Sequence, residues 1–208
     1  MRYDWMNEYL LSRRAVTKDL QEDWNWIRYK IGGRMFAAIL LDRNDKPYYI
    51  NLKLDPEEGE FLRGQYADII PGYYSDKRCW ISVLSDGTVP DELLRGLLDK
   101  SRRLVLKRFS KKRQREILGL SCCGSDCAAC YCRDMCAGCN AACGKVFHMP
   151  GGEACPIYAC CVNRHRFATC AECDEAPCEL WLSERDPSMS DEAFEANINE
   201  RLGNLKGI

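Results

Sequence analysis

Cysteine is the residue that most constrains this chain, because 14 of its 15 cysteines lie between Cys122 and Cys178. In a secreted chain, this density would predict a disulfide framework. The N-terminus shows no apolar segment followed by a small-residue cleavage site, so we expect a cytoplasmic protein whose thiols stay reduced. Reduced, clustered cysteines are typical of metal sites, and the pattern therefore favours metal ligands over disulfides.

The spacing of the cysteines points to zinc. Three pairs are separated by two residues: Cys127 with Cys130, Cys136 with Cys139, and Cys170 with Cys173. This spacing lets both sulfurs of a pair reach one ion at about 2.3 Å. We predict a structural module with two Zn²⁺ ions, each held by four thiolates. The candidate ligands, from which the eight are drawn, are Cys123, Cys127, Cys130, Cys136, Cys139, Cys143, Cys155, Cys160, Cys170, Cys173 and Cys178.

The other thiols and the two histidines are given lesser roles. We expect Cys122, Cys132 and Cys161 to be spare thiols beside ligands, and His148 and His165 to be surface residues. Large apolar residues are scarce after Cys122, so we expect little apolar core there and a metal ion in its place.

An iron–sulfur cluster is the main alternative to zinc. Cys123, Cys127 and Cys130 have the spacing that radical-SAM enzymes use to hold a 4Fe–4S cluster. Those enzymes surround the cofactor with a large barrel, which about 85 residues cannot form. A simple electron-transfer cluster stays open as an alternative.

Charge changes along the chain near the start of the cysteine cluster. Residues 1–120 hold 23 Lys and Arg against 18 Asp and Glu, whereas residues 121–208 hold 7 against 13. A polyanion should therefore meet the first half. No apolar run approaches the ~20 residues that span a bilayer, so we expect no membrane segment. We predict an α+β domain over residues 1–117 and a cysteine-rich metal-binding domain with a C-terminal helix over residues 118–208.

The first domain carries clear strand and helix signals. Gly32-Gly33 separates two apolar runs, which is typical of a tight hairpin. Asp55 can cap a helix that has Pro56 at its first position. The order of elements predicts an antiparallel sheet with helices on one face. The predicted strands are Trp26 to Ile31, Met35 to Leu41, Tyr48 to Leu54 and Cys79 to Leu84, and the predicted helices surround Tyr9, follow Asp55 and Pro90, and run from Ser190 to Gly203.

Residues 1–115 resemble the MmcQ/YjbR family. The matching segments are Ile31 to Ala37, Asn51 to Glu58, Pro71 to Tyr73, Lys77 to Trp80, Val89 to Leu94 and Ser101 to Val105. The resemblance implies a frataxin-like α+β fold with the double-wing arrangement, and members are often described as DNA-binding. Tyr74 and Cys79 stand where the family carries histidines.

Residues 121–185 resemble a small cysteine-rich family of bacterial and archaeal proteins of unknown function. Its members share an opening Cys-Gly-x-x-Cys-x-x-Cys, a Cys-x-Gly-Cys knuckle, a Cys-x-Ile-x-x-Cys element and a closing Cys-x-x-Cys followed by Pro-Cys. All four elements stand in this order between Cys123 and Cys178. The resemblance implies zinc binding and no known activity.

The cations of the first domain are the candidate nucleic-acid contacts. The segment from Lys100 to Glu116 is dense in Lys and Arg, which suits tracking of phosphates. Tyr73, Tyr74 and Trp80 would offer stacking surfaces. The alternative is a solvated helix face with the aromatic residues in the core, and the modest net charge does not decide between the two. The candidate contacts are Arg28, Lys30, Arg34, Lys53, Lys77, Arg78, Arg102, Arg103, Lys107, Arg108, Lys111, Lys112 and Arg113.

No Ser-His-Asp arrangement, phosphate-binding glycine loop or paired carboxylate is visible in the sequence. We therefore expect a non-enzymatic zinc-binding protein that contacts DNA or RNA through its first domain. Two alternatives stay open: a redox or metal-handling protein with an iron–sulfur cluster or labile zinc, and an adaptor that binds a protein partner through the zinc module. We expect a monomer.

Overall fold

The chain divides into two compact units. A computed structural model describes residues 1–130, 133–146, 149–206 and 208, so the predictions for Cys132 and His148 lie outside the described residues. The units are Met1–Phe109 and Ser110–Ile208. The division comes earlier than the boundary after residue 117 that the sequence suggests, because helix α4 (Lys111–Leu118) belongs to the second unit. Its Arg115 donates hydrogen bonds to Asn140 and to the carbonyl of Ala168.

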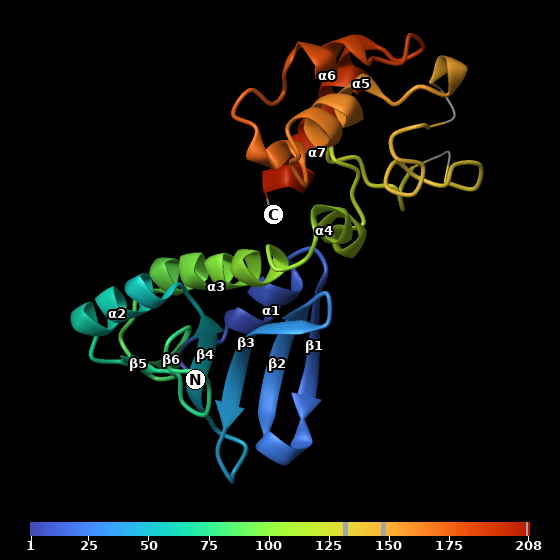
Figure 1. The fold of residues 1–208 in the computed structure, drawn as a ribbon. Coiled ribbons are helices and arrows are strands. Elements are labelled where there is room, and N and C mark those ends of the chain that lie inside the picture. The colour runs from blue at the N-terminus through green and yellow to red at the C-terminus, as the bar shows by residue number, and fades with distance from the viewer. Residues whose placement is uncertain (131–132, 147–148, 207) are drawn as a thin grey trace. The chain divides into compact units, whose positions relative to one another are not determined.

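The first unit is an α+β domain built on a six-stranded antiparallel sheet. The strand order is β1-β2-β3-β4-β6-β5, so β1 and β5 are the edges. Helix α3 crosses β2, β3 and β4, and α2 contacts β5 and β6 (Figure 1). In chain order, the elements are α1 (Met6–Leu11), β1 (Val16–Gln21), the 3-10 turn η1 (Glu22–Trp24), β2 (Trp26–Ile31), β3 (Arg34–Leu41), β4 (Pro47–Lys53), α2 (Pro56–Gln65), β5 (Ile69–Pro71), β6 (Trp80–Leu84) and α3 (Asp91–Leu106).

Local sequence signals explain most of these boundaries. Gly32 and Gly33 both have positive φ, 56° and 79°, which closes the predicted hairpin between β2 and β3. Asp55 caps α2 by accepting a hydrogen bond from the amide of Glu57 at 3.1 Å, with Pro56 in the first turn. The predicted hairpin and helix start are both confirmed.

The two edge strands are absent from the sequence prediction. β1 carries polar residues at most of its positions, and β5 has only three residues, ending at Pro71. Neither segment shows the alternation of apolar and polar residues that identifies a half-buried strand. Pairing with β2 and β6, respectively, makes each segment a strand.

A buried polar pair lies on the sheet face opposite α2. Ile81 lies against Gly59 of α2, and side chains alternate along a strand, so Ser82 points to the other face. There, its hydroxyl donates to Asn51 Oδ1 at 2.5 Å. Both polar side chains are fully buried, on a face that also carries the apolar residues Ala38 and Leu40. This pair holds the loop between β5 and β6 against the sheet, as shown below.

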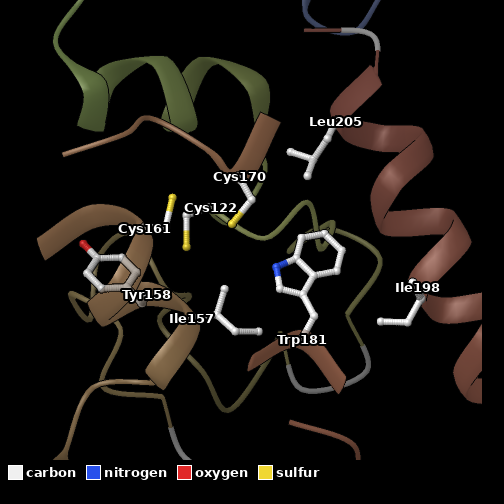
Figure 2. Packing of buried hydrophobic residues seen from close by; sticks show 8 residues of the cluster. All are labelled: Cys122, Ile157, Tyr158, Cys161, Cys170, Trp181, Ile198 and Leu205. Carbon is white, nitrogen blue, oxygen red and sulfur yellow. The ribbon is translucent and has the colours of Figure 1, made fainter. Parts of the chain in front are cut away.

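The second unit contains a small apolar core despite its scarcity of large apolar residues. The core packs Trp181, Tyr158 and Ile157 against two residues of the last helix, Ile198 and Leu205 (Figure 2). The prediction of little apolar core was therefore too pessimistic. After α4, the elements are η2 (Pro150–Gly152), α5 (Pro156–Tyr158), the π-helical turn η3 (Ala159–Arg164), the 3-10 turn η4 (Cys170–Glu172), α6 (Glu179–Ser183) and α7 (Asp191–Lys206).

Helix α7 is longer than the sequence predicts. The expected end at Gly203 is wrong, because the helix continues through that glycine to Lys206. Gly203 lacks the positive φ that would end the helix, and its α-carbon faces open space. The extra turn brings Leu205 into the core.

Candidate metal centre and basic pocket

Four cysteines from separate segments of the second unit form what we call the four-thiol group: Cys123, Cys127, Cys139 and Cys155. Cys139 interacts electrostatically with all three of the others. Burial, together with these neighbouring sulfurs, raises the pKa of its thiol to about 12. The fold therefore brings together sulfurs that are up to 32 positions apart in the printed sequence.

Backbone amides are directed at these sulfurs. The amide of Cys139 donates to the sulfur of Cys127, and the amides of Ile157 and Tyr158 donate to the sulfur of Cys155. In the adjacent knuckle, Gly138 N donates to Cys136 Sγ at 3.3 Å. Hydrogen bonds from amides favour the thiolate form, which is the form that binds a metal. Burial nevertheless raises the pKa of the Cys127 and Cys155 thiols overall, and the amide hydrogen bonds offset part of that rise.

Cys123 is held by the last helix. Arg201 of α7 donates to the carbonyl of Cys123 at 3.2 Å, and Asn204 donates to the carbonyl of Gly124 at 3.0 Å. Gly124 has a φ of 81°, and a β-carbon there would lie 2.4 Å from the Arg201 carbonyl, so only glycine fits. Burial opposes ionisation of Cys123, but the charge of Arg201 and hydrogen bonds from Ser121 and Ser125 lower the pKa of its thiol overall.

The donor set of the four-thiol group fits a soft divalent ion such as Zn²⁺. Four thiols and their amide donors match the chemistry of a structural zinc site. Within residues 1–130, 133–146, 149–206 and 208, however, no three Cys, His, Asp or Glu side chains already have an arrangement that could hold an ion. For this group to hold an ion, its sulfurs would have to move toward one another.

A second set of thiols belongs to the apolar core. Cys122, Cys161 and Cys170 are 2%, 4% and 6% exposed, and Figure 2 shows them grouped beside Trp181 and Tyr158. The thiol of Cys170 donates to Cys161, that of Cys161 donates to Cys122, and the indole N–H of Trp181 donates to Cys170. These contacts and burial raise the pKa of Cys161 and Cys170. We call these three residues the core triad.

The core triad changes the predicted assignment of three residues. Cys122 and Cys161 are core residues rather than spare thiols, and Cys170 lies in the core with them while also interacting electrostatically with Cys123. Cys130 and Cys136 lie beside Cys127 and Cys139 at the four-thiol group. The other predicted ligands are exposed or half-buried and belong to neither set: Cys143, Cys160, Cys173 and Cys178.

The first unit contains a basic pocket of about 640 Å³ beside α2. Four predicted nucleic-acid contacts line it: Lys53, Lys77, Arg78 and Arg108. A fifth cation, Arg63, was missed because it looks like an ordinary residue in the last turn of a helix. Three acids, Asp55, Glu60 and Asp76, share the lining and leave a cationic excess. This is the main place in the first unit where the predicted contacts meet.

The other predicted cations of the first unit are dispersed. Arg28 and Lys30 both pair with Asp19, and their hydrogen bonds lower the pKa of that carboxyl to about 2. Arg34 stacks over the ring of Phe109. Arg102 is wrong as a surface contact, because it is 2% exposed and donates to the carbonyl of Arg14.

The basic run from Lys100 to Glu116 is not one continuous surface. Arg103 is exposed on α3 and Lys107 follows its last residue, whereas Lys111, Lys112 and Arg113 begin α4 in the second unit. Lys111 pairs with Glu172, and Arg113 pairs with Glu116. The run therefore serves two units rather than one groove. In the described ranges, no helix is both long and apolar enough to cross a bilayer.

Similarity to known proteins identifies the family. Residues 11–104 match the family described as YjbR. The uncharacterized protein YbdF of Escherichia coli O157:H7 is 35% identical over 89 residues, and the chain covers 71% of it. The chain belongs to the YjbR family. The uncharacterized protein YyaQ of Bacillus subtilis (strain 168) is 36% identical over 118 residues, and the match covers 46% of this chain and 99% of that protein.

A solved structure supports the YjbR fold. The Deinococcus radiodurans protein DR2400, with domain DUF419, has a TM-score of 0.50 at 36% sequence identity, covering 57% of this chain and 88% of that one. The YjbR match lies within the first unit, which we now call the YjbR unit. The resemblance of the cysteine-rich segment to a second family stays a prediction.

Proposed function

We propose that this protein is a non-enzymatic zinc-binding protein whose second unit holds Zn²⁺ through the four-thiol group. The observation that carries the proposal is the gathering of Cys123, Cys127, Cys139 and Cys155. Backbone amides donate to three of these four sulfurs, those of Cys123, Cys127 and Cys155, and the amide that reaches Cys123 belongs to Ser125. A bound zinc stabilises the site by drawing thiolates together, and this chain supplies the loops and the clamp from α7 that present them.

The four-thiol group differs from the iron–sulfur motif that the sequence suggests. The iron–sulfur alternative uses Cys123, Cys127 and Cys130, but Cys130 is exposed. Cys139 and Cys155 come from segments outside that motif, so the four-thiol group is not the set that the iron–sulfur alternative uses. Four thiolates suit both a tetrahedral zinc site and a 4Fe–4S cluster, and metal analysis decides between the two. A second ion, as the cysteine count predicts, would require ligands among Cys143, Cys160, Cys173 and Cys178.

Metal content tests the zinc proposal. We expect the colourless, anaerobically purified full chain to contain zinc, and Cys139→Ser to lose one zinc per chain in elemental analysis. Cys79→Ser removes the one cysteine of the YjbR unit and should leave the zinc ratio unchanged. Iron with sulfide in the purified protein, or an unchanged zinc ratio in Cys139→Ser, would refute the assignment.

A second function is favoured for the YjbR unit: binding of nucleic-acid phosphates by the basic pocket. The pocket gathers five cations from β4, α2, the loop before β6 and the segment after α3. Such a concentration attracts phosphates and releases their counterions. The pocket is a more specific feature than the mild net charge of the unit, and it involves residues that are distant in sequence.

Salt dependence tests the phosphate-binding proposal. We expect the full chain to bind DNA at about 50 mM salt and to weaken as salt rises. Lys77→Gln with Arg78→Gln should lower the slope of log affinity against log salt by about 2, because each lost phosphate contact contributes about 0.9 for duplex DNA. Arg43→Gln, an exposed cation outside the pocket, is the matched control. Equal slopes for the double variant and the wild type would contradict the proposal.

A further inference from the structure

Four tyrosines of the YjbR unit form a continuous aromatic cluster. The ring of Tyr73 lies 5.2 Å from Tyr49, 5.9 Å from Tyr48 and 4.5 Å from Tyr74, measured between ring centroids. The cluster reaches the surface through Tyr74, which is 80% exposed, and Tyr73, which is 38% exposed. Large aromatic rings this exposed lose little by contacting a ligand and gain stacking area.

The loop that presents these rings is fixed from beneath. Asn51 Nδ2 donates to the carbonyl of Tyr73 at 2.8 Å and to Ser75 Oγ at 3.1 Å, and the amide of Tyr73 donates to Ser82 Oγ at 2.7 Å. These bonds use the buried Asn51 and Ser82 side chains. The tyrosine cluster is therefore a preorganised platform, which reduces the ordering cost of binding.

Tyr74 has a backbone conformation that its side chain does not favour. Its φ is 53°, in the left-handed region that non-glycine residues rarely adopt. Strain of this kind persists where the surrounding structure enforces it, and it often marks binding sites. Here, it turns an exposed ring onto the ring of Tyr73 in an edge-on contact.

The platform adjoins the basic pocket. A hollow of about 610 Å³, lined by residues 70–77, contains Tyr73 and Tyr74. Asp76 and Lys77 line both this hollow and the basic pocket. Flat rings and cations thus share one short loop, which is the combination that binds bases and phosphates of one strand together.

We propose that the tyrosine cluster and the basic pocket together bind single-stranded nucleic acid, with unpaired bases stacked on Tyr74 and Tyr73 and the phosphates toward Lys77. This inference rests on the phosphate-binding function proposed above and specifies its ligand. Base faces inside a duplex are already covered by neighbouring bases, so only an unpaired strand can use the platform. Stacking is tolerant of base identity, so the site is not sequence-specific.

The inference is tested on the zinc-loaded full chain with labelled oligothymidine and a labelled duplex of equal length. Fluorescence anisotropy measures the binding of each. We expect tighter binding of the single strand. Tyr74→Asn removes the ring but tolerates the left-handed φ, and it should weaken oligothymidine binding about tenfold and leave duplex binding unchanged. Tyr74→Phe keeps the ring and should bind as the wild type does.

An exposed aromatic residue elsewhere supplies the matched control. Phe61→Ala removes a ring that is 64% exposed on α2 and lines neither cavity, so oligothymidine binding should not change. Duplex binding equal to or tighter than single-strand binding, or an unaffected Tyr74→Asn, would overturn the inference. If the double variant Lys77→Gln with Arg78→Gln still weakens the binding of both ligands in that case, the phosphate-binding function is retained and only the single-strand inference fails. If neither nucleic acid binds, both proposals fail.

Discussion

Removing zinc with a strong chelator under reducing conditions should unfold the second unit and leave the YjbR unit intact. Structural zinc contributes about 10 kcal/mol or more to the folding of small modules. The core around Trp181 is small, and the loops that carry Cys127 and Cys139 have little regular structure around them. If the second unit holds zinc as proposed, loss of the ion should remove much of the stability of this unit.

Hydrogen exchange measured by mass spectrometry on separate peptides is the appropriate readout, because it reports on each unit within the full chain. After chelation, amide protection should disappear in peptides from α7 and persist in those from β3 and β4. The YjbR unit thus serves as the internal control. Full protection of α7 after complete zinc removal would show that the ion is dispensable for folding.

Replacing Trp181 by alanine should destabilise the second unit by about 3–5 kcal/mol, the usual cost of removing a large buried aromatic side chain. Trp181 is 1% exposed, and the guanidinium carbon of Arg201 lies 4.1 Å from the centroid of its ring. Its indole N–H donates to the sulfur of Cys170. Its loss therefore opens a cavity and leaves the core triad without its polar neighbour. The protection of α7 peptides in the zinc-loaded protein measures the effect.

The adjacent residue on the same helix provides the control for this experiment. Leu182 is 53% exposed, so Leu182→Ala should change stability by no more than about 0.5 kcal/mol. Similar losses of stability in the two variants would mean that the buried side chain of Trp181 contributes no more than an exposed residue of α6 does. A large loss in Trp181→Ala alone would establish that the apolar core contributes to the stability of this unit.

Much of the YjbR unit follows from local sequence signals. Asp55 with Pro56 and the Gly32-Gly33 pair act through nearby backbone atoms, so their structural effect can be predicted without knowing the fold. The edge strands β1 and β5 could not be predicted this way, because only their pairing partners make them strands. The start of α4 was readable in principle: Ser110 caps it, and Gly119 ends it with a φ of 65°.

The candidate metal site shows the limit of spacing arguments. A pair such as Cys136 and Cys139 predicts that two sulfurs share one turn, and the amide of Gly138 does contact Cys136. Spacing does not reveal which loops meet, and it could not show that Cys139 lies near Cys155 or that Cys170 turns into the core. Arg201 gave no signal, since one arginine in a polar helix is unremarkable in a sequence.

The edges of the sheet bear on how copies of this protein can associate. β5 offers three residues, and the ring of Pro71 leaves its last position without an amide to donate. β1 presents Lys18 and Asp19, whose charges discourage a foreign strand from adding alongside. Neither border of the sheet is suited to intermolecular strand addition, so fibril-like growth by this route is disfavoured and self-association would have to use side-chain surfaces instead.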